Sequence, residues 1–176
     1  MGLRGKLAAE IEIKSSAEAY FKRLKDELHH LPDAASGVHG VEVHEGDFKT
    51  HGSVKSWTYT LGNEEVLWTS GALDLPHTVL WLSDPSYGRT EIFKERFEID
   101  ERDMTVSMVA VDGHILQRYK SYKVIYKVIP KTGTEPAAVR VTLDYEKHKE
   151  IDADPHKEME FMISMMKDID KHLLGQ

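Results

Sequence analysis

Residues 154–175 have the sequence DPHKEMEFMISMMKDIDKHLLG, and this stretch decides the fold. Asp154 followed by Pro155 is typical of a helix start, and Gly175 stands where helices commonly end. Between them the apolar side chains recur every three or four residues and form one stripe, made of Met159, Met162, Ile163, Met166, Ile169 and Leu173. A helix with such a stripe must bury it against another element, so the rest of the chain should supply a surface.

The preceding residues supply that surface as a series of strands. Apolar and polar side chains alternate with a period of two, which is typical of strands with one dry and one wet face. The alternation predicts strands over residues 6–14, 40–45, 53–60, 93–99, 105–111, 119–129 and 139–145. The turn sequences Glu45-Gly46-Asp47 and Asp112-Gly113 lie beside these strands, and the later strands therefore predict an antiparallel meander.

A helix is predicted directly after the first strand. Ser15 can cap it, and Glu18, three residues later, can complete a capping box. Leu31-Pro32-Asp33 interrupts the pattern, and residues 33–40 allow a second short helix. The order of strand, helix, many strands and one long helix is an α+β arrangement, and a curved sheet closing around the terminal helix would bury the stripe. A chain of 176 residues suits one domain, residues 1–176.

Composition excludes several functions. The 23 Lys and Arg against 30 Asp and Glu give a net charge of −7, which argues against nucleic acid or an anionic membrane as partner. The chain has no Cys, so disulfides and thiolate chemistry are excluded. No apolar run reaches the roughly 18 residues that span a membrane, and no secretory signal opens the chain. We therefore expect a soluble, cytoplasmic protein.

Motifs for cofactors and metals are also missing from the sequence. The 10 His residues show no metal-binding spacing: His29 and His30 are adjacent, and His39 and His44 fall on opposite faces of a strand. No nucleophile elbow, P-loop or dinucleotide fingerprint occurs. We expect neither a metal nor a cofactor.

Methionine and aromatic side chains mark either an ordinary core or a ligand cavity. Four of the seven Met residues lie on the terminal helix, and methionine is common on surfaces that accept varied ligands. Aromatic side chains on the dry strand faces would project toward that helix, and a buried Tyr or Trp needs a partner for its polar hydrogen. The residue pattern alone leaves core and cavity open.

Glu95 is the most unusual single residue, because it shares the apolar face of its strand with Phe93 and Phe97. An inward carboxylate would have a raised pKa unless it is paired, and it could then act as a general acid or base. The alternative is a structural pair with an inward Lys or Tyr, for example Lys55. Glu95 is the only catalytic candidate.

Several runs of sequence resemble the plant major latex proteins, which belong with the birch pollen allergen (Bet v I type) proteins. These runs are HGVEVHEGDF (39–48), GSVKSWTY (52–59), FKERFEID (93–100), VAVDG (109–113) and YKSYKVIYKV (119–128). The resemblance implies a helix-grip fold, in which a sheet wraps around the terminal helix and encloses a hydrophobic cavity. It also implies cytosolic plant proteins that carry hydrophobic small molecules and are associated with defence or stress, with a minority of enzymes acting on alkaloid or terpenoid intermediates.

With this resemblance we expect a cavity on the order of several hundred Å³. The ligand-binding residues we expect are Leu24, Trp57, Tyr59, Phe93, Glu95, Phe97, Val106, Met108, Tyr122, Val124, Tyr126, Val141, Met159, Met162, Ile163 and Met166. The ligand would be a hormone, flavonoid, sterol-like molecule or alkaloid. The rival hypothesis is an isomerase or cyclase that uses Glu95 in the same cavity, and a third is a copy that folds poorly.

Two features depart from the family pattern. The stretch Glu45–Gly52 has only two glycines, so phosphate capture by a glycine-rich loop is not expected. Residues 67–92 form an extra segment in the hairpin between the third and fourth strands, either translated intron or gene-model sequence or an evolved lid. Its apolar side chains predict that it covers the cavity mouth or supports weak self-association. We expect that deleting it leaves a folded protein.

Overall fold

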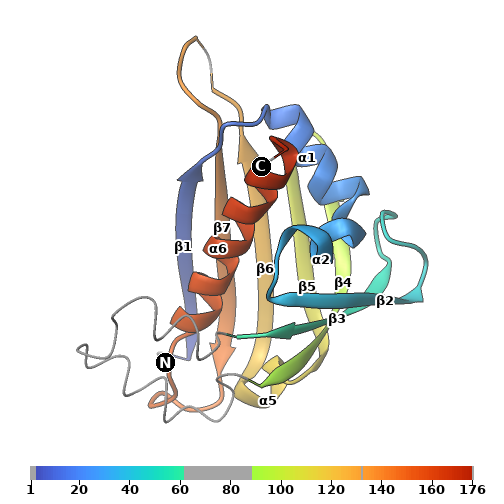
Figure 1. The fold of residues 1–176 in the computed structure, drawn as a ribbon. Coiled ribbons are helices and arrows are strands. Elements are labelled where there is room, and N and C mark those ends of the chain that lie inside the picture. Colours follow the sequence, from blue (N-terminus) through green and yellow to red (C-terminus); the bar gives the residue numbers. More distant parts are fainter. Residues whose placement is uncertain (1–2, 62–88, 132, 176) are drawn as a thin grey trace.

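The computed structural model describes residues 3–61, 89–131 and 133–175 (Figure 1). Its centre is a seven-stranded sheet in which every pair of neighbouring strands is antiparallel. The strands are β1 (Arg4–Glu12), β2 (Val38–Glu45), β3 (Val54–Thr60), β4 (Thr90–Asp100), β5 (Thr105–Gly113), β6 (Tyr119–Ile129) and β7 (Ala138–Lys147). Their order is β1-β7-β6-β5-β4-β3-β2, a meander from β2 to β7 to which β1 adds at the edge. The predicted α+β class and meander are confirmed.

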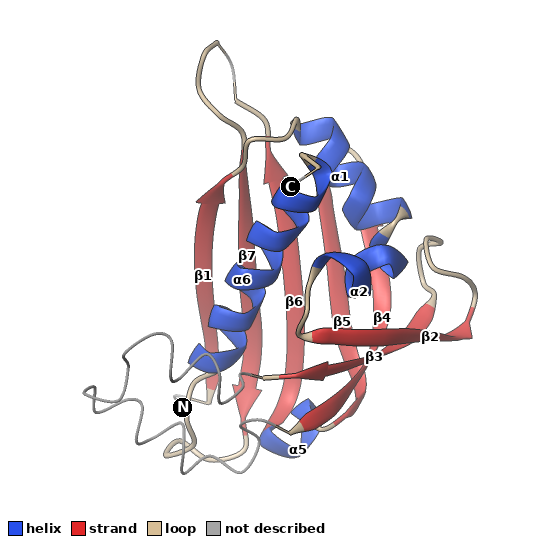
Figure 2. Cartoon of the chain, viewed as in Figure 1, coloured by secondary structure: helices blue, strands red, loops and turns tan. Residues whose placement is uncertain are grey.

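The larger helices lie on one face of this curved sheet, and the short α5 (Ile115–Arg118) lies at its end, between β5 and β6 (Figure 2). The others are α1 (Ala17–Asp26), the 3-10 turn η1 (Leu28–His30), α2 (Leu31–Ala34) and the terminal α6 (His156–Leu173). The long α6 runs along the inner face of the sheet and contacts β1, β7, α1 and α2. Burial of its apolar side is therefore achieved as the sequence pattern predicted.

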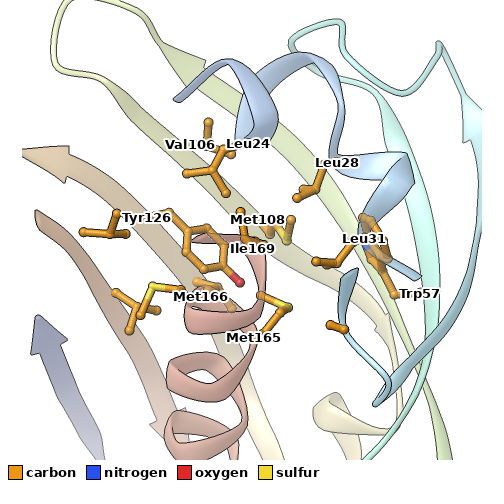
Figure 3. Close-up of a cluster of buried hydrophobic side chains, with 14 of the residues drawn as sticks. Leu24, Leu28, Leu31, Trp57, Val106, Met108, Tyr126, Met165, Met166 and Ile169 are labelled. Carbon is orange, nitrogen blue, oxygen red and sulfur yellow. The ribbon is translucent and has the colours of Figure 1, made fainter. Parts of the chain in front are cut away.

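The core lies between α6 and the inner face of the sheet (Figure 3). Side chains alternate between buried and exposed along β4 and β7, as the period of two predicts. From α6, Met166 and Ile169 are fully buried against this layer. Figure 3 shows side chains from α1, the sheet and α6 meeting in one interior.

The predicted helix caps are partly wrong. Asp154 does not cap α6, because its carboxylate accepts a hydrogen bond from the Tyr145 hydroxyl at 2.7 Å and lies 3.3 Å from Lys147 Nζ. The helix begins at His156 without a side-chain cap. At its other end Gly175 has the expected positive φ of 77°. The residues before α6 are thus held by β7 instead of by a helix cap.

At the start of α1 the cap is Ser16, not Ser15 as predicted. Ser16 Oγ accepts the backbone N–H of Ala19 at 3.1 Å. The Ser15 hydroxyl instead donates to Asp170 Oδ1 at 2.6 Å, and the backbone N–H groups of Lys14 and Ser15 donate to the same carboxylate at 2.9 and 3.0 Å. Asp170 therefore ties α6 to the junction of β1 and α1 across 155 residues of sequence.

The extra segment predicted at residues 67–92 includes three residues, 90–92, that belong to β4. Thr90, Glu91 and Ile92 lie in β4 and pair with Thr60, Tyr59 and Thr58 of β3. Glu91 is only 3% exposed, so its removal would take away a buried side chain of the sheet. The predicted end of the segment is therefore wrong, because residues 90–92 belong to β4. Residues 67–88 lie outside the described residues, and whether they are dispensable stays a prediction.

Replacement of Asp170 tests the link between α6 and the sheet. We expect Asp170→Ala to lower the free energy of unfolding by about 2–4 kcal/mol, because two buried backbone donors and one hydroxyl lose an ionised acceptor. Urea unfolding followed by circular dichroism measures the change. Asp168→Ala on the same helix, whose carboxyl faces Lys171, is the matched control and should cost less than about 1 kcal/mol. Equal losses in the two variants would contradict the assignment.

Candidate functional site

An apolar cavity lies between α6, α2 and strands β2 to β6. The side chains that line it come from eight helices and strands and from Leu61, directly after β3. They are Leu31, Val38, Trp57, Tyr59, Leu61, Phe93, Met108, Ile115, Tyr122, Tyr126, Glu158, Phe161, Met162 and Met165. Aromatic and aliphatic groups dominate this wall, and Glu158 is its one charged member among the described residues. Such a wall is typical of a site for an apolar small molecule.

The cavity is smaller than the sequence led us to expect. The centre of a water molecule fits within a volume of about 40 Å³, enough for one or a few waters. The prediction of several hundred Å³ is wrong for the side-chain positions of this structure. Its reason is physical: Met108, Met162, Met165 and Phe161 extend into the space between helix and sheet and fill most of it.

Seven of the sixteen residues predicted to bind ligand line this cavity. These are Trp57, Tyr59, Phe93, Met108, Tyr122, Tyr126 and Met162. Eight others are buried elsewhere in the core: Leu24, Glu95, Phe97, Val106, Val124, Val141, Met159 and Met166. Ile163 is half-buried and does not line the cavity either. The structure therefore brings together about half of the predicted set, and contact with a ligand stays a prediction.

The rotation of α6 explains the differences that fall on this helix. Its cavity face carries Glu158, Phe161, Met162 and Met165, which follow the three- and four-residue spacing of one helix face. The apolar stripe was instead centred on Met159 and Met166, which face the sheet. Glu158 lies on this face, and its charge made the face look polar in sequence. Phe161 and Met165, which are spaced four residues apart, were the apolar positions that could have indicated it. Leu31, Val38, Leu61 and Ile115 were missed because they lie at loop ends and in short helices.

A buried polar cluster lies at the α5 end of the cavity. The Arg118 guanidinium donates two hydrogen bonds to the Glu91 carboxylate, at 2.8 and 3.0 Å, and one to Glu158 Oε1 at 3.3 Å. The Tyr59 hydroxyl donates to Glu91 Oε2 at 3.1 Å, and burial next to that carboxylate raises the pKa of Tyr59. Burial also raises the pKa of Glu158, which Arg118 partly offsets. The cluster joins β3, β4, α5 and α6.

Tyr122 is the polar exception in the wall. The other polar side chains facing the cavity have partners: Tyr59 binds Glu91, Trp57 Nε1 donates to Glu95 at 3.2 Å, and the Tyr126 hydroxyl donates to Met162 Sδ at 3.1 Å. The Tyr122 hydroxyl is buried and has no hydrogen-bond partner in the described part of the chain. A buried unsatisfied hydroxyl costs free energy, so it is a place where a ligand atom would be favoured.

Glu95 points inward, as predicted, and is paired with Lys55. Lys55 Nζ lies 3.6 Å from Glu95 Oε1, 3.7 Å from the centre of the Phe97 ring, and donates to the Phe48 carbonyl at 3.1 Å. Both charged side chains are almost completely buried. Burial raises the pKa of Glu95 to about 7, against the opposing effects of Lys55 and Trp57, and lowers the pKa of Lys55. Glu95 does not line the cavity, whereas Trp57, which donates to it, does.

The loop after β2 binds its own backbone. Asp47 Oδ1 accepts the N–H groups of Lys49 and Thr50 at 2.9 and 2.6 Å, and Oδ2 accepts the Thr50 hydroxyl. The amide groups that would hold a phosphate in a glycine-rich loop are therefore occupied by this carboxylate. This agrees with the expectation that the loop does not capture phosphate.

Two searches of the described residues gave negative results. Over residues 3–61, 89–131 and 133–175, no group of three or more His, Asp or Glu side chains is arranged to hold a metal ion. In the same residues, no helix combines the length and the apolar composition that a membrane crossing needs.

A seven-stranded antiparallel sheet wrapped around a terminal helix, with an apolar cavity between them, defines a helix-grip protein. The model of the pathogenesis-related protein Bet v 1 family matches residues 2–69 and 82–176. The chain belongs to this family, whose members generally bind ligands. The model leaves residues 70–81 unmatched, which lie inside the predicted extra segment.

Relatives within the family are major latex proteins. MLP-like protein 328 of Arabidopsis thaliana is 31% identical over 175 residues, which cover 99% of each chain. The crystal structure of major latex-like protein 151 of Panax ginseng matches with a TM-score of 0.78 and 29% identity, covering 98% of this chain and 99% of that one. The structure of norcoclaurine synthase of Thalictrum flavum, in complex with dopamine and hydroxybenzaldehyde, matches with a TM-score of 0.68 and covers 98% of this chain and 88% of that one. Its sequence identity is 18%, so this match shows the fold alone.

The titration of Glu95 tests the buried Lys55–Glu95 pair. We expect a pKa of about 7, measured as the midpoint of its side-chain carboxyl carbon shift by NMR. Lys55→Met should raise the pKa further, because the ammonium group favours the ionised carboxylate. A midpoint below about 5 would contradict the burial seen here.

The same titration predicts how stability changes with pH. Between 4.5, the ordinary value, and about 7, Glu95 binds more protons in the folded than in the unfolded chain. The free energy of unfolding should therefore fall as the pH rises through this window, by at most about 3 kcal/mol. Glu95→Gln should remove that fall in chemical unfolding experiments, and Glu98→Gln on the wet face of β4 controls for the loss of one carboxylate.

Proposed function

We propose that this protein binds and carries a hydrophobic small molecule in the cavity between α6 and the sheet. The observation that carries the proposal is the wall itself, which is apolar and aromatic with few polar atoms, within the described residues. Family membership supports it, because the family generally binds ligands. The acidic chain, with its net charge of −7, is poorly suited to nucleic acid.

Binding in a cavity this small requires side chains to move. Met108, Met162 and Met165 are unbranched, and their thioethers adopt several rotamers at little cost. Phe161 is only half-buried, so its ring can swing outward from the helix. Displacement of these four side chains would enlarge the space without moving the sheet. The ligand would then replace contacts that the methionines make with one another.

The finer proposal concerns ligand class and setting. Molecules with a rigid apolar body and a few polar groups fit such a wall, which includes plant hormones, flavonoids, sterol-like molecules and alkaloids. We propose a cytoplasmic plant carrier with a role in defence or stress responses. The description of the family as pathogenesis-related supports the role, and the plant origin of the relatives supports the setting.

The second candidate function is catalysis, with the protein acting as an isomerase or cyclase. One observation favours it. Glu95 has a pKa of about 7 and a second oxygen without a hydrogen-bond partner in the described residues, as a general acid or base would need. Against it, Glu95 is fully buried and does not line the cavity. Its bonds to Lys55 and to Trp57 give it a structural task, so binding is the better supported function.

Probe binding tests the carrier proposal. We expect a neutral fluorescent apolar probe, N-phenyl-1-naphthylamine, to bind the folded protein and to be displaced by plant flavonoids and sterols. Met162→Trp should weaken probe binding at least about tenfold, because the indole fills the cavity. Ile163→Trp, at the neighbouring half-buried position outside the cavity, is the matched control and should change binding little. No probe binding, or equal losses in both variants, would contradict the proposal.

Replacement of Glu95 separates the two functions. If Glu95 transfers a proton, Glu95→Gln should abolish turnover while leaving ligand affinity largely unchanged. We expect instead no turnover of any compound that binds, in the unmodified protein or in the variant. Turnover measured by mass spectrometry in the unmodified protein, lost in Glu95→Gln with its fold intact by NMR, would establish catalysis.

A further inference from the structure

We propose that Tyr122 and Glu158 form the polar end of the ligand site and select an apolar molecule that ends in a hydrogen-bond donor, an ammonium or hydroxyl group, over one that ends in a carboxylate. This inference rests on the proposed binding function and names the class of ligand. Both side chains line the cavity, Tyr122 from β6 and Glu158 from α6. They lie close enough that the Glu158 charge affects the ionisation of Tyr122.

The unsatisfied hydroxyl of Tyr122 is the first observation. It is buried, with the whole residue 3% exposed, and it lacks a hydrogen-bond partner in the described part of the chain. Every other polar side chain on the cavity wall already has a partner there. A ligand oxygen or nitrogen near Tyr122 would therefore gain a bond that the empty site lacks, without breaking one that exists.

The charge of the cluster is the second observation. Glu91 and Glu158 contribute two carboxylates, and within the described residues Arg118 is the guanidinium that contacts both. Lys157 lies near enough to lower the pKa of Glu158, with a smaller effect than Arg118. Arg118 donates two hydrogen bonds to Glu91 and a single longer one, 3.3 Å, to Glu158. Of the two carboxylates, Glu158 thus has the weaker contact with Arg118. It is also the carboxylate that faces the cavity, whereas Glu91 and Arg118 do not line it.

The position of Glu158 gives the ligand its orientation. Glu158 lines the apolar cavity and also an open polar groove outside it, formed by α5, the start of β6 and the segment before α6. The charged side chains of that groove balance in number: Arg118, Lys149 and Lys157 against Asp152, Asp154 and Glu158. A polar ligand end at Glu158 would remain near water, while the apolar body would extend toward Leu31 and Val38. This arrangement avoids the cost of burying an unpaired ligand charge.

The sign of selection follows from these contacts. A ligand carboxylate at this end would meet the carboxylate of Glu158 in a site of low polarity, and the repulsion would oppose binding. An ammonium group would donate to Glu158 with opposite charge, and a hydroxyl could donate to Glu158 and accept from Tyr122. Donors are therefore favoured and anions are excluded.

Four probes with one apolar body test the inference. They are 2-ethylnaphthalene, 2-(2-naphthyl)ethanol, 2-(2-naphthyl)ethylamine and 2-naphthylacetate, each titrated at pH 7 into the full-length protein and followed by NMR and calorimetry. We expect the amine and the alcohol to bind about tenfold or more tightly than the carboxylate, as one charge-assisted hydrogen bond allows. Glu158→Gln, which keeps the shape and the contact with Arg118, should reduce that ratio to below about threefold. Tyr122→Phe should weaken the alcohol more than the hydrocarbon.

The outcomes separate this inference from the function on which it rests. Binding of ethylnaphthalene with no preference among the polar probes would overturn the inference and leave a carrier of apolar molecules. A carboxylate that binds as tightly as the amine, or a preference unchanged in Glu158→Gln, would also overturn it. If no probe binds, ethylnaphthalene included, the binding function fails and the inference fails with it. NMR spectra of both variants establish that their fold is intact.

Discussion

The fold depends on burial of the apolar side of α6 against the inner face of the sheet. Met166 and Ile169 are fully buried there, and each contributes roughly 1.5–3 kcal/mol to stability. The adjacent Asp170 accepts three hydrogen bonds from the β1–α1 junction, and these directional contacts fix the rotation of the helix as well as its position. That rotation decides which side chains face the cavity, namely Glu158, Phe161, Met162 and Met165. One contact far from the cavity therefore determines the composition of its wall.

Much of the fold could be predicted from sequence because strands such as β4, β6 and β7 have one dry and one wet face. The site was harder to predict, for two physical reasons. Ser15 and Ser16 are equally good caps, and only a carboxylate 155 residues away in sequence decides that Ser15 binds Asp170. Likewise, a helix with apolar residues over a wide arc can face the sheet at several rotations. Glu158, polar in sequence and buried in structure, gave no sign that it belonged to the wall.

Buried charge at two places behind or beside the cavity wall is not explained by stability. The Lys55–Glu95 pair and the Arg118 cluster take several ions out of water, and such pairs seldom stabilise a fold more than apolar side chains of similar size. Each instead holds a side chain of the wall: Glu95 binds the Trp57 indole, and Glu91 binds the Tyr59 hydroxyl. Both aromatic rings are thereby fixed in orientation. The sheet side of the cavity is rigid for this reason.

The side chains on the helix side of the cavity are held less firmly than those on the sheet side. Phe161, Met162 and Met165 project from α6, and the described contacts give them one hydrogen bond, the weak one from Tyr126 to the Met162 sulfur. Their displacement costs mainly dispersion contacts, which an apolar ligand restores. Displacement of Trp57 or Tyr59 would also break hydrogen bonds to buried carboxylates. Adaptation to ligand shape therefore falls to α6, and discrimination between polar groups falls to the side chains that stay in place.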